Sequence, residues 1–310
     1  NGGTSSAAQA QIDGQISETP GTPKVSLQYF FTPSQLIYAN AAKGFRAGGV
    51  NQVLTSAADG SLAQYDLTTA VLPRTYESDT VWSYELGSKT SLWDGRAQIN
   101  AAVYHTDWDN VQTFLFIGDG AVFNVPSARS RGVELEGQLR PVRPLTLNAA
   151  VTRTSAKYTS SMIIPGGPET RAGDLSIARD GQKFAQPAWT VDFGARYDFN
   201  LASLGRAYAR IDYRWFDSYR TAVPGTAQFS PDSSTIPAQK NINLRLGLEL
   251  DRFDVSLFAL NATDEKKCAR GGGRSQCTND DCSTYNSYAF GRTISAPTPR
   301  QVGIQVSFRP

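Results

Sequence analysis

Hydrophobic and polar residues alternate with a period of two along most of the chain. The clearest stretch is 241–250, where every even-numbered position is Ile or Leu and every odd-numbered position is Asn, Arg, Gly or Glu. The stretches 191–198, 207–215 and 302–308 alternate in the same way. Because successive side chains of a β-strand point to opposite faces, the pattern predicts strands with one apolar and one polar face.

The connections between these stretches alternate between tight turns and long loops, with one short exception at 118–120. Tight turns are expected at 32–34, 93–95, 141–144, 200–205 and 251–252, and long loops at 44–78, 159–186, 221–238 and 263–298. Eleven strands are predicted: 24–31, 35–43, 79–92, 96–117, 121–139, 145–158, 187–199, 206–220, 239–250, 253–262 and 299–309. Long strands with short turns at one end and long loops at the other are typical of an all-β, antiparallel transmembrane β-barrel.

A soluble β-sandwich or propeller is the alternative, because its strands alternate as well. Soluble strands average about 5–6 residues, however, and the predicted ones are mostly much longer. Their polar face is rich in Arg, Glu, Asp and Asn, which does not suit a dry core. In lipid, a sheet must close on itself to satisfy its backbone hydrogen bonds. The pattern therefore favours the membrane barrel.

Composition excludes several other classes of protein. The 30 Lys and Arg residues and the 28 Asp and Glu residues leave a formal net charge of +2, which argues against nucleic-acid binding. The longest apolar runs, such as 114–117, are far shorter than the about 20 residues of a transmembrane helix. One histidine and three cysteines remove most catalytic dyads and zinc cages. We therefore expect no catalytic residues, no cofactor and no metal site.

Five segments, in order along the chain, resemble motifs of the TonB-dependent outer-membrane receptors. The segment 43–51 resembles a strand-to-loop motif that ends in Gly-Phe-Arg-x-Gly-Gly-x-Asn. Residues 84–89 resemble the Tyr-Glu-x-Gly-x-Lys strand, and residues 131–136 resemble the Arg-Gly-x-Glu-x-Glu strand. Asn261-Ala262-Thr263-Asp264 loosely resembles the end of the penultimate strand, and residues 299–308 resemble the closing strand.

The resemblance runs from about residue 24 to residue 310 and implies the C-terminal half of a 22-stranded barrel. Residues 1–23 are then the tail of a surface loop. The resemblance also implies that the other barrel half and the N-terminal plug, which contacts the TonB energy-transducing complex, lie outside this chain. The remaining partners that the resemblance implies are outer-membrane lipid and a small-molecule ligand, typically a ferric siderophore. The implied location is the bacterial outer membrane.

The polar positions of the predicted strands, which alternate with the apolar ones and form what we call the polar phase, include charged side chains that a barrel would turn toward its lumen. Their expected role is to solvate the interior and to pair with one another or with the plug, and direct contact with a ligand is the alternative. Glu134 and Glu136 share a face, but acid–base catalysis would need a partner that the pattern does not supply. The predicted lumen-facing residues are Glu85, Lys89, Glu134, Glu136, Arg140, Arg196, Asp212, Arg214, Arg245 and Glu249.

The apolar phase carries the single histidine and two pairs of aromatic residues. We expect His105 to lie outside the barrel near the membrane rim. Trp82, Tyr84, Tyr213 and Trp215 suit the aromatic girdles at the two membrane interfaces, with stacking on a ligand as the alternative.

The long loops hold the candidate ligand contacts, because recognition is commonly built from loops on a rigid scaffold. Arg offers a planar fork for carboxylate, catecholate or phosphate oxygens, and Tyr adds stacking area. The candidates are Arg46, Asn51, Tyr65, Arg171, Arg179, Tyr219, Arg220, Arg270 and Arg274. Cys268, Cys277 and Cys282 share the last long loop, where an oxidising cell surface favours one disulfide and leaves three possible pairs open.

Active, TonB-coupled uptake of a scarce solute is the function that these features favour. A passive outer-membrane porin and a soluble or surface-attached all-β binding module are the alternatives, and a barrel enzyme is the least favoured. A plug segment upstream would separate a receptor from a porin. Extraction without detergent would indicate the soluble module.

Overall fold

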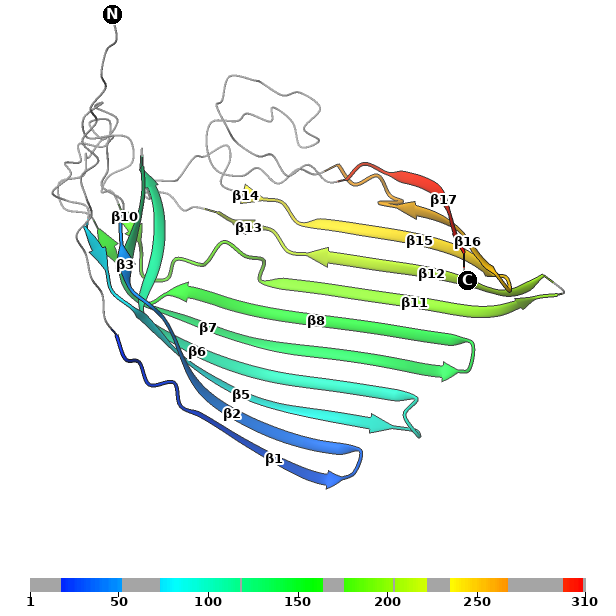
Figure 1. The fold of residues 1–310 in the computed structure, drawn as a ribbon, viewed down its shortest axis with the longest axis horizontal. Coiled ribbons are helices and arrows are strands. Elements are labelled where there is room, and N and C mark those ends of the chain that lie inside the picture. The colour runs from blue at the N-terminus through cyan, green and yellow to red at the C-terminus, as the bar shows by residue number, and fades with distance from the viewer. Residues whose placement is uncertain are drawn as a thin grey trace, which may run out of the picture.

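The computed structural model describes residues 18–51, 73–117, 119–163, 176–202, 204–221, 235–266 and 298–308. One antiparallel sheet of eleven strands dominates it (Figure 1). Its strands are β1 (Lys24–Thr32), β2 (Gln35–Arg46), β5 (Asp79–Leu92), β6 (Ala97–Ile117), β7 (Asp119–Val142), β8 (Leu145–Tyr158), β11 (Trp189–Leu201), β12 (Gly205–Phe216), β15 (Gln239–Glu249), β16 (Phe253–Leu260) and β17 (Gln301–Phe308). Within the described ranges, no helix is long and apolar enough to cross a membrane.

Each strand of the sheet pairs with the next large strand in the sequence, so the order is a simple meander from β1 to β17. Tight turns join the strands at one end, and the long connections leave from the other end. The sheet is curved like a trough, and β1 and β17 form its two edges (Figure 1). The predicted all-β class, the antiparallel pairing and the eleven strands are therefore confirmed.

Short strand pairs extend the bases of the long loops. They are β3 (Gly49–Val50) with β4 (Thr75–Tyr76), β9 (Met162–Ile163) with β10 (Ser176–Ala178), and β13 (Tyr219–Arg220) with β14 (Thr235–Ile236). The strand predicted at 206–220 consequently ends at Phe216, and its last two residues form β13. The strand predicted at 121–139 is longer than expected, because β7 begins directly after the short connection at residue 118.

The two faces of the sheet differ as the alternation predicts. The register places Leu86, Val103 and Val133 side by side on one face, and Leu246 lies beside Leu257 further along the same face. No described segment covers these residues, since Leu246 is 50% exposed and Leu257 is 51% exposed. A soluble sandwich would bury such side chains between two sheets, so the geometry fits a lipid-facing surface instead.

Aromatic rings lie over glycines on the opposite, polar face. A Cβ added to Gly87 would lie 2.5 Å from the ring of Tyr38, and one added to Gly132 would lie 2.3 Å from the ring of Tyr104. In each pair the ring and the glycine are direct cross-strand partners. This close approach explains the glycines of the Tyr-Glu-x-Gly-x-Lys and Arg-Gly-x-Glu-x-Glu segments.

The dry core of the described chain lies beyond the trough, at its loop end. There β6 and β7 continue as a hairpin that bends away from the sheet, next to β3 and β10 (Figure 1). Val111, Phe123 and Val125 of this hairpin are buried together with Ile177 and Ala178 of β10. The hairpin is therefore held in place by packing, and it gives the loop side of the molecule a fixed framework.

Asn261 ties the loop-side ends of three strands together. It is buried and has a φ of 46°, in the left-handed region that Asn tolerates. Its N–H donates to Asn243 Oδ1 at 3.0 Å, and its Nδ2 donates to the carbonyl oxygens of Glu265 and Thr298 at 3.0 and 2.9 Å. These bonds link β15, the end of β16 and the start of β17, which explains the Asn at the head of the Asn-Ala-Thr-Asp segment.

Asp264, three residues further on, lies in the same turn. Desolvation raises the pKa of this carboxyl group, but the Arg300 N–H and the Lys266 ammonium outweigh that effect and hold the pKa below its usual value. Asp264 therefore stays ionised at neutral pH, and its contacts with both partners weaken only as the pH falls through this lowered pKa.

Candidate functional site

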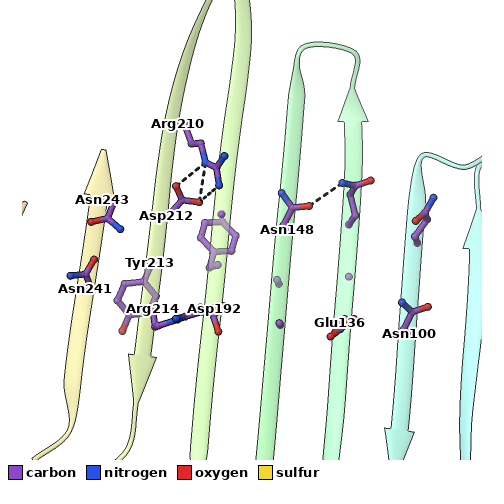
Figure 2. A pocket seen from close by; sticks show the side chains of 17 residues that line it. Asn100, Glu136, Asn148, Asp192, Arg210, Asp212, Tyr213, Arg214, Asn241 and Asn243 are labelled. Carbon is purple, nitrogen blue, oxygen red and sulfur yellow. Dashed lines mark hydrogen bonds and ion pairs between the residues drawn. The ribbon is translucent and has the colours of Figure 1, made fainter. Parts of the chain in front are cut away.

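An open groove with a volume of about 800 Å³ lies along the polar face of the central strands. Strands β6, β7, β8, β11, β12 and β15 contribute to its wall. Figure 2 shows amide, carboxylate and guanidinium groups from neighbouring strands along this wall. Its polar lining consists of Gln98, Asn100, Glu136, Gln138, Asn148, Asp192, Arg210, Asp212, Arg214, Asn241 and Asn243.

Ion pairs and amide contacts order the groove. Arg214 Nε donates to Asp192 Oδ1 at 2.5 Å, and Arg210 Nε donates to Asp212 Oδ2 at 2.7 Å (Figure 2). Of the two guanidinium side chains, that of Arg214 is the more accessible, with 68% exposed against 51%. An oxygen-rich solute in the groove would therefore meet Arg214 and the surrounding amides, which are strong hydrogen-bond donors.

A second set of paired charges lies toward the short-turn end. Arg196 Nη2 donates to Asp198 Oδ1 at 2.8 Å and to Glu249 Oε1 at 3.2 Å, and its guanidinium lies 4.0 Å from the centre of the Tyr208 ring. Arg245 Nη1 donates to Gln305 Oε1 at 3.0 Å. The contacts of Arg196 with Glu249 and of Arg245 with Gln305 each reach across one intervening strand, β12 in the first case and β16 in the second.

The other predicted lumen residues lie in β7, which is part of the groove wall, and in the adjacent β5. Glu136 is part of the groove lining, and alternation along β7 places Glu134 on the same face. Lys89 Nζ lies 5.9 Å from the centre of the Tyr38 ring, on the polar face that Glu85 also shares. Arg140 is exposed near the short-turn end of β7.

Arg46 is built into the rim of the trough. Its Nε donates to Asp79 Oδ2 at 2.9 Å, its Nη2 also binds Asp79, and its guanidinium lies 4.8 Å from the centre of the Trp108 ring. Asp79 is only 1% exposed and also accepts a bond from the Gln112 N–H at 3.2 Å. This predicted ligand contact thus connects the end of β2 and the start of β5 to the middle of β6.

Asn51 fastens the first long loop to the bent hairpin. Its Oδ1 accepts the Val122 N–H at 2.7 Å, and its Nδ2 donates to the carbonyl oxygens of Val122 and Pro73 at 2.8 and 2.9 Å. Asn51 is only 8% exposed. All the polar atoms of this side chain are therefore engaged in holding the loop base.

The remaining candidates divide between described and undescribed residues. Tyr219 and Arg220 form β13, and the Tyr219 ring lies 6.4 Å from that of Phe216. The Arg179 N–H donates to Gln182 Oε1 at 3.0 Å in the connection before β11. The described geometry does not bring these three residues to the groove. Outside the described residues lie Tyr65, Arg171, Arg270, Arg274, Cys268, Cys277 and Cys282.

Sequence reasoning missed two kinds of residue. The groove amides, such as Asn100, Asn148 and Asn243, fall on the polar phase, but they carry no charge to single them out. Asp79 and Trp108 complete the rim around Arg46, although they lie 33 and 62 positions away in the sequence. Periodicity could have found the amides, whereas only the strand register reveals the partners of Arg46.

His105 and the aromatic residues near it lie on the apolar face, away from the groove. The Trp82 and Tyr84 rings stack with centres 6.0 Å apart, and the Tyr84 and His105 ring centres are 6.3 Å apart. Within the part of the chain that the structure describes, no group of three or more His, Cys, Asp or Glu side chains could hold a metal ion.

The sequence of this chain matches a protein-family model and is similar to known proteins. A family model described as "TonB dependent receptor-like, beta-barrel" matches residues 2–263. The metal-pseudopaline receptor CntO of Pseudomonas aeruginosa is 25% identical to this chain over 157 residues, which is 51% of this chain and 20% of that protein.

Solved structures share the fold at low sequence identity. The ferric yersiniabactin uptake receptor FyuA from Yersinia pestis has a TM-score of 0.61 and 16% identity, and the match covers 91% of this chain and 36% of that one. The siderophore receptor PiuA from Acinetobacter baumannii has a TM-score of 0.60 and 15% identity, covering 91% and 35%. The chain thus spans little more than a third of the length of these receptors.

Proposed function

Because this chain belongs to the TonB-dependent receptor family, whose β-barrels lie in the outer membrane, we propose that it works in the active uptake of a scarce solute. In this proposal the chain supplies barrel wall and outer loops. It forms the C-terminal half of a 22-stranded barrel, and the other strands and the plug that contacts the TonB complex complete the receptor. The edges β1 and β17 are where the other half would pair.

The observation that carries the proposal is the contrast between the two faces of one sheet. One face presents exposed Leu, Val and Ile side chains, and the other holds a polar groove of about 800 Å³. A wall with lipid on one side and a wet, hydrogen-bonding interior on the other suits the passage of a hydrophilic solute. The same exposed apolar face disfavours the soluble binding module.

We propose a ferric siderophore as the solute. The similar proteins named above are receptors for metal-pseudopaline, ferric yersiniabactin and a siderophore. The groove supports this choice, because its amides and the exposed Arg214 guanidinium can donate hydrogen bonds to the oxygen-rich periphery of such a chelate.

Uptake of radioactive iron tests the proposal. Cells that express the full receptor are given a panel of ferric siderophores under iron limitation, and uptake is compared with that of a deletion strain. We expect receptor-dependent uptake of at least one chelate, and we expect that uptake to stop in a strain without TonB.

A passive porin would give a different result in the same assay. Solutes would enter through the receptor at equal rates with and without TonB, and entry would follow solute size rather than chelate identity. Receptor-dependent entry that persists without TonB would therefore replace the uptake proposal with the porin.

A further inference from the structure

The apolar face of the sheet ends, at its loop side, in a cross-strand row of charged residues. Register pairing joins Trp82 to Asp107, Asp107 to Arg129, Arg129 to Lys157, and Lys157 to Lys183. Cross-strand partners share a face, so this row lies on the outward side of the sheet together with the apolar residues. The row is thus placed where the apolar face gives way to the outer loops.

The next cross-strand row, one step closer to the apolar residues of the same face, also contains a positively charged side chain. It contains Tyr84, His105 and Arg131 as consecutive partners. One row further, Arg153 is the partner of Val133, and its guanidinium lies 5.5 Å from the centre of the Trp189 ring. Positive charge therefore borders the apolar surface directly, and aromatic rings lie beside it.

A chain of hydrogen bonds holds two of these cations in place. Arg131 Nε donates to His105 Nδ1 at 2.9 Å, His105 Nε2 lies 2.7 Å from Asp107 Oδ2, and Arg129 Nε donates to Asp107 Oδ1 at 2.7 Å. Each guanidinium uses one of its five N–H donors in this chain. These hydrogen bonds orient both guanidinium groups before any ligand binds. Less conformational entropy is therefore lost when a further acceptor binds to them.

The balance of charge on this surface is positive. Arg129, Arg131, Arg153, Lys157 and Lys183 make up what we call the outer basic patch. Two acidic residues of β6, Asp107 and Asp109, lie on the same outward side of the sheet as the patch. The five cations of the patch outnumber the two carboxylates on that strand, and 41% of the Arg129 side chain remains exposed beside its ion pair.

We propose that the outer basic patch binds the phosphate groups of a phosphorylated lipid in the outer leaflet of the membrane. Cations next to an apolar, lipid-facing surface lie at the depth of the headgroups, where phosphate oxygens are their natural acceptors. The Arg forks match phosphate geometry, and Trp82, Tyr84 and Trp189 suit the interfacial zone. The inference depends on the outer-membrane location of the barrel and is independent of the solute carried.

Native mass spectrometry of the purified full receptor tests this inference. The receptor is placed in phosphatidylcholine nanodiscs that contain a small fraction of bisphosphorylated lipid A, and the bound lipid is counted. We expect retention of lipid A by the wild type. For the double variant K157Q/K183Q we expect binding about 25-fold weaker, because each cation near a membrane surface is worth about fivefold in affinity.

Two further variants control for folding and for charge in general. R129Q/R131Q removes the two ordered forks, and we expect a loss similar to that in K157Q/K183Q. R143Q/R252Q removes two cations from the short-turn end of the sheet, and we expect no change. The shift in electrophoretic mobility on heating verifies that each variant is a folded barrel, and lipid retention is compared for whichever double variant of the patch folds.

Three outcomes would overturn the inference. The first is equal lipid retention by the wild type and by a folded patch variant. The second is an equal loss in R143Q/R252Q, which would indicate unspecific charge attraction. The third is displacement of the lipid by inorganic phosphate at equal concentration, which would make the patch a site for a soluble anion.

Discussion

Asp79 shows how the chemistry of one residue organises the rim of the trough. Its carboxylate accepts bonds from the Arg46 side chain, the Arg46 N–H and the Gln112 N–H, and the residue is almost fully buried. Buried acceptors that lose their charge leave their donors poorly satisfied. The rim between β2, β5 and β6 therefore depends on this one carboxylate.

The variant Asp79→Asn tests that dependence. The amide nitrogen would face N–H donors, and we expect the rim to lose about 1–3 kcal/mol of local stability. Limited proteolysis of the folded receptor should then cut near the loop ends of β2 and β5 faster than in the wild type. Asp212→Asn is the matched control, because its ion pair with Arg210 is partly exposed and should contribute at most about 1 kcal/mol. Equal cleavage rates for all three proteins would argue against the rim assignment.

A substitution at Asn51 can distinguish a structural role of this residue from direct contact with the ligand. All its polar side-chain atoms bind backbone groups of Pro73 and Val122. In Asn51→Ala we expect faster hydrogen exchange at the Val122 amide, because its acceptor is gone. If the exchange rate of Val122 stays unchanged while ligand affinity falls, Asn51 contacts the ligand directly and the loop-base role is wrong.

At the scale of the strands, glycines under aromatic rings set the local fit of the sheet. A Cβ at Gly132 would lie 2.3 Å from the Tyr104 ring, whose hydroxyl lies 2.8 Å from Thr154 Oγ1. A Cβ at Gly137, on the same strand, would meet only the Gln98 carbonyl oxygen at 3.6 Å. The same substitution should therefore have different effects at two nearby positions.

We expect Gly132→Ala to lower the unfolding free energy of the barrel by about 1–3 kcal/mol, because the Tyr104 ring must leave its place. Gly137→Ala should stay within about 0.5 kcal/mol of the wild type. Urea unfolding of the receptor in detergent or lipid measures both changes. Equal stability of the two variants would show that the close approach of Tyr104 does not constrain β7.

Neighbouring positions of β15 test the two faces of a strand. Leu246→Arg should cost about 2–4 kcal/mol if the position is near the middle of the bilayer, because the cation would face hydrocarbon. Arg245→Gln should cost much less, since this side chain lies on the polar face and an amide can still bond to Gln305. Unfolding in lipid vesicles checks the pair, and similar costs for both would contradict the assignment of faces.

The strands of the large sheet were predictable from sequence because each has eight or more residues, enough for the alternation to be recognised. Two-residue strands such as β3 and β13 were not, because two positions carry no period. The bend of the β6–β7 hairpin was also missed. Asn110 has a positive φ, and the β6–β7 register skips it, passing from the pair Asp109–Ser127 to the pair Val111–Val125. Nothing in the alternation marks that change.

At the scale of the whole molecule, the resemblance in five short motifs identified the family and the architecture, while the site was only partly predictable. The groove charges Asp212 and Arg214 fall on the predicted phase. The sequence predicts Arg46 and Asn51, in contrast, to be ligand contacts in loops, but the partners that they have in the structure are set by strand register and by the packing of the hairpin. Such long-range contacts cannot be derived from local pattern.

The arrangement of lipid-facing and lumen-facing residues is the central claim, and accessibility along β15 tests it most directly. Spin labels are placed one at a time at Ile242, Leu244 and Leu246 and at Asn241, Asn243 and Arg245 in the full receptor, reconstituted in lipid bilayers. We predict that the first three labels collide mainly with oxygen, which dissolves in the bilayer, and that the other three collide mainly with a water-soluble nickel chelate. Equal or reversed accessibility in the two sets would contradict the account.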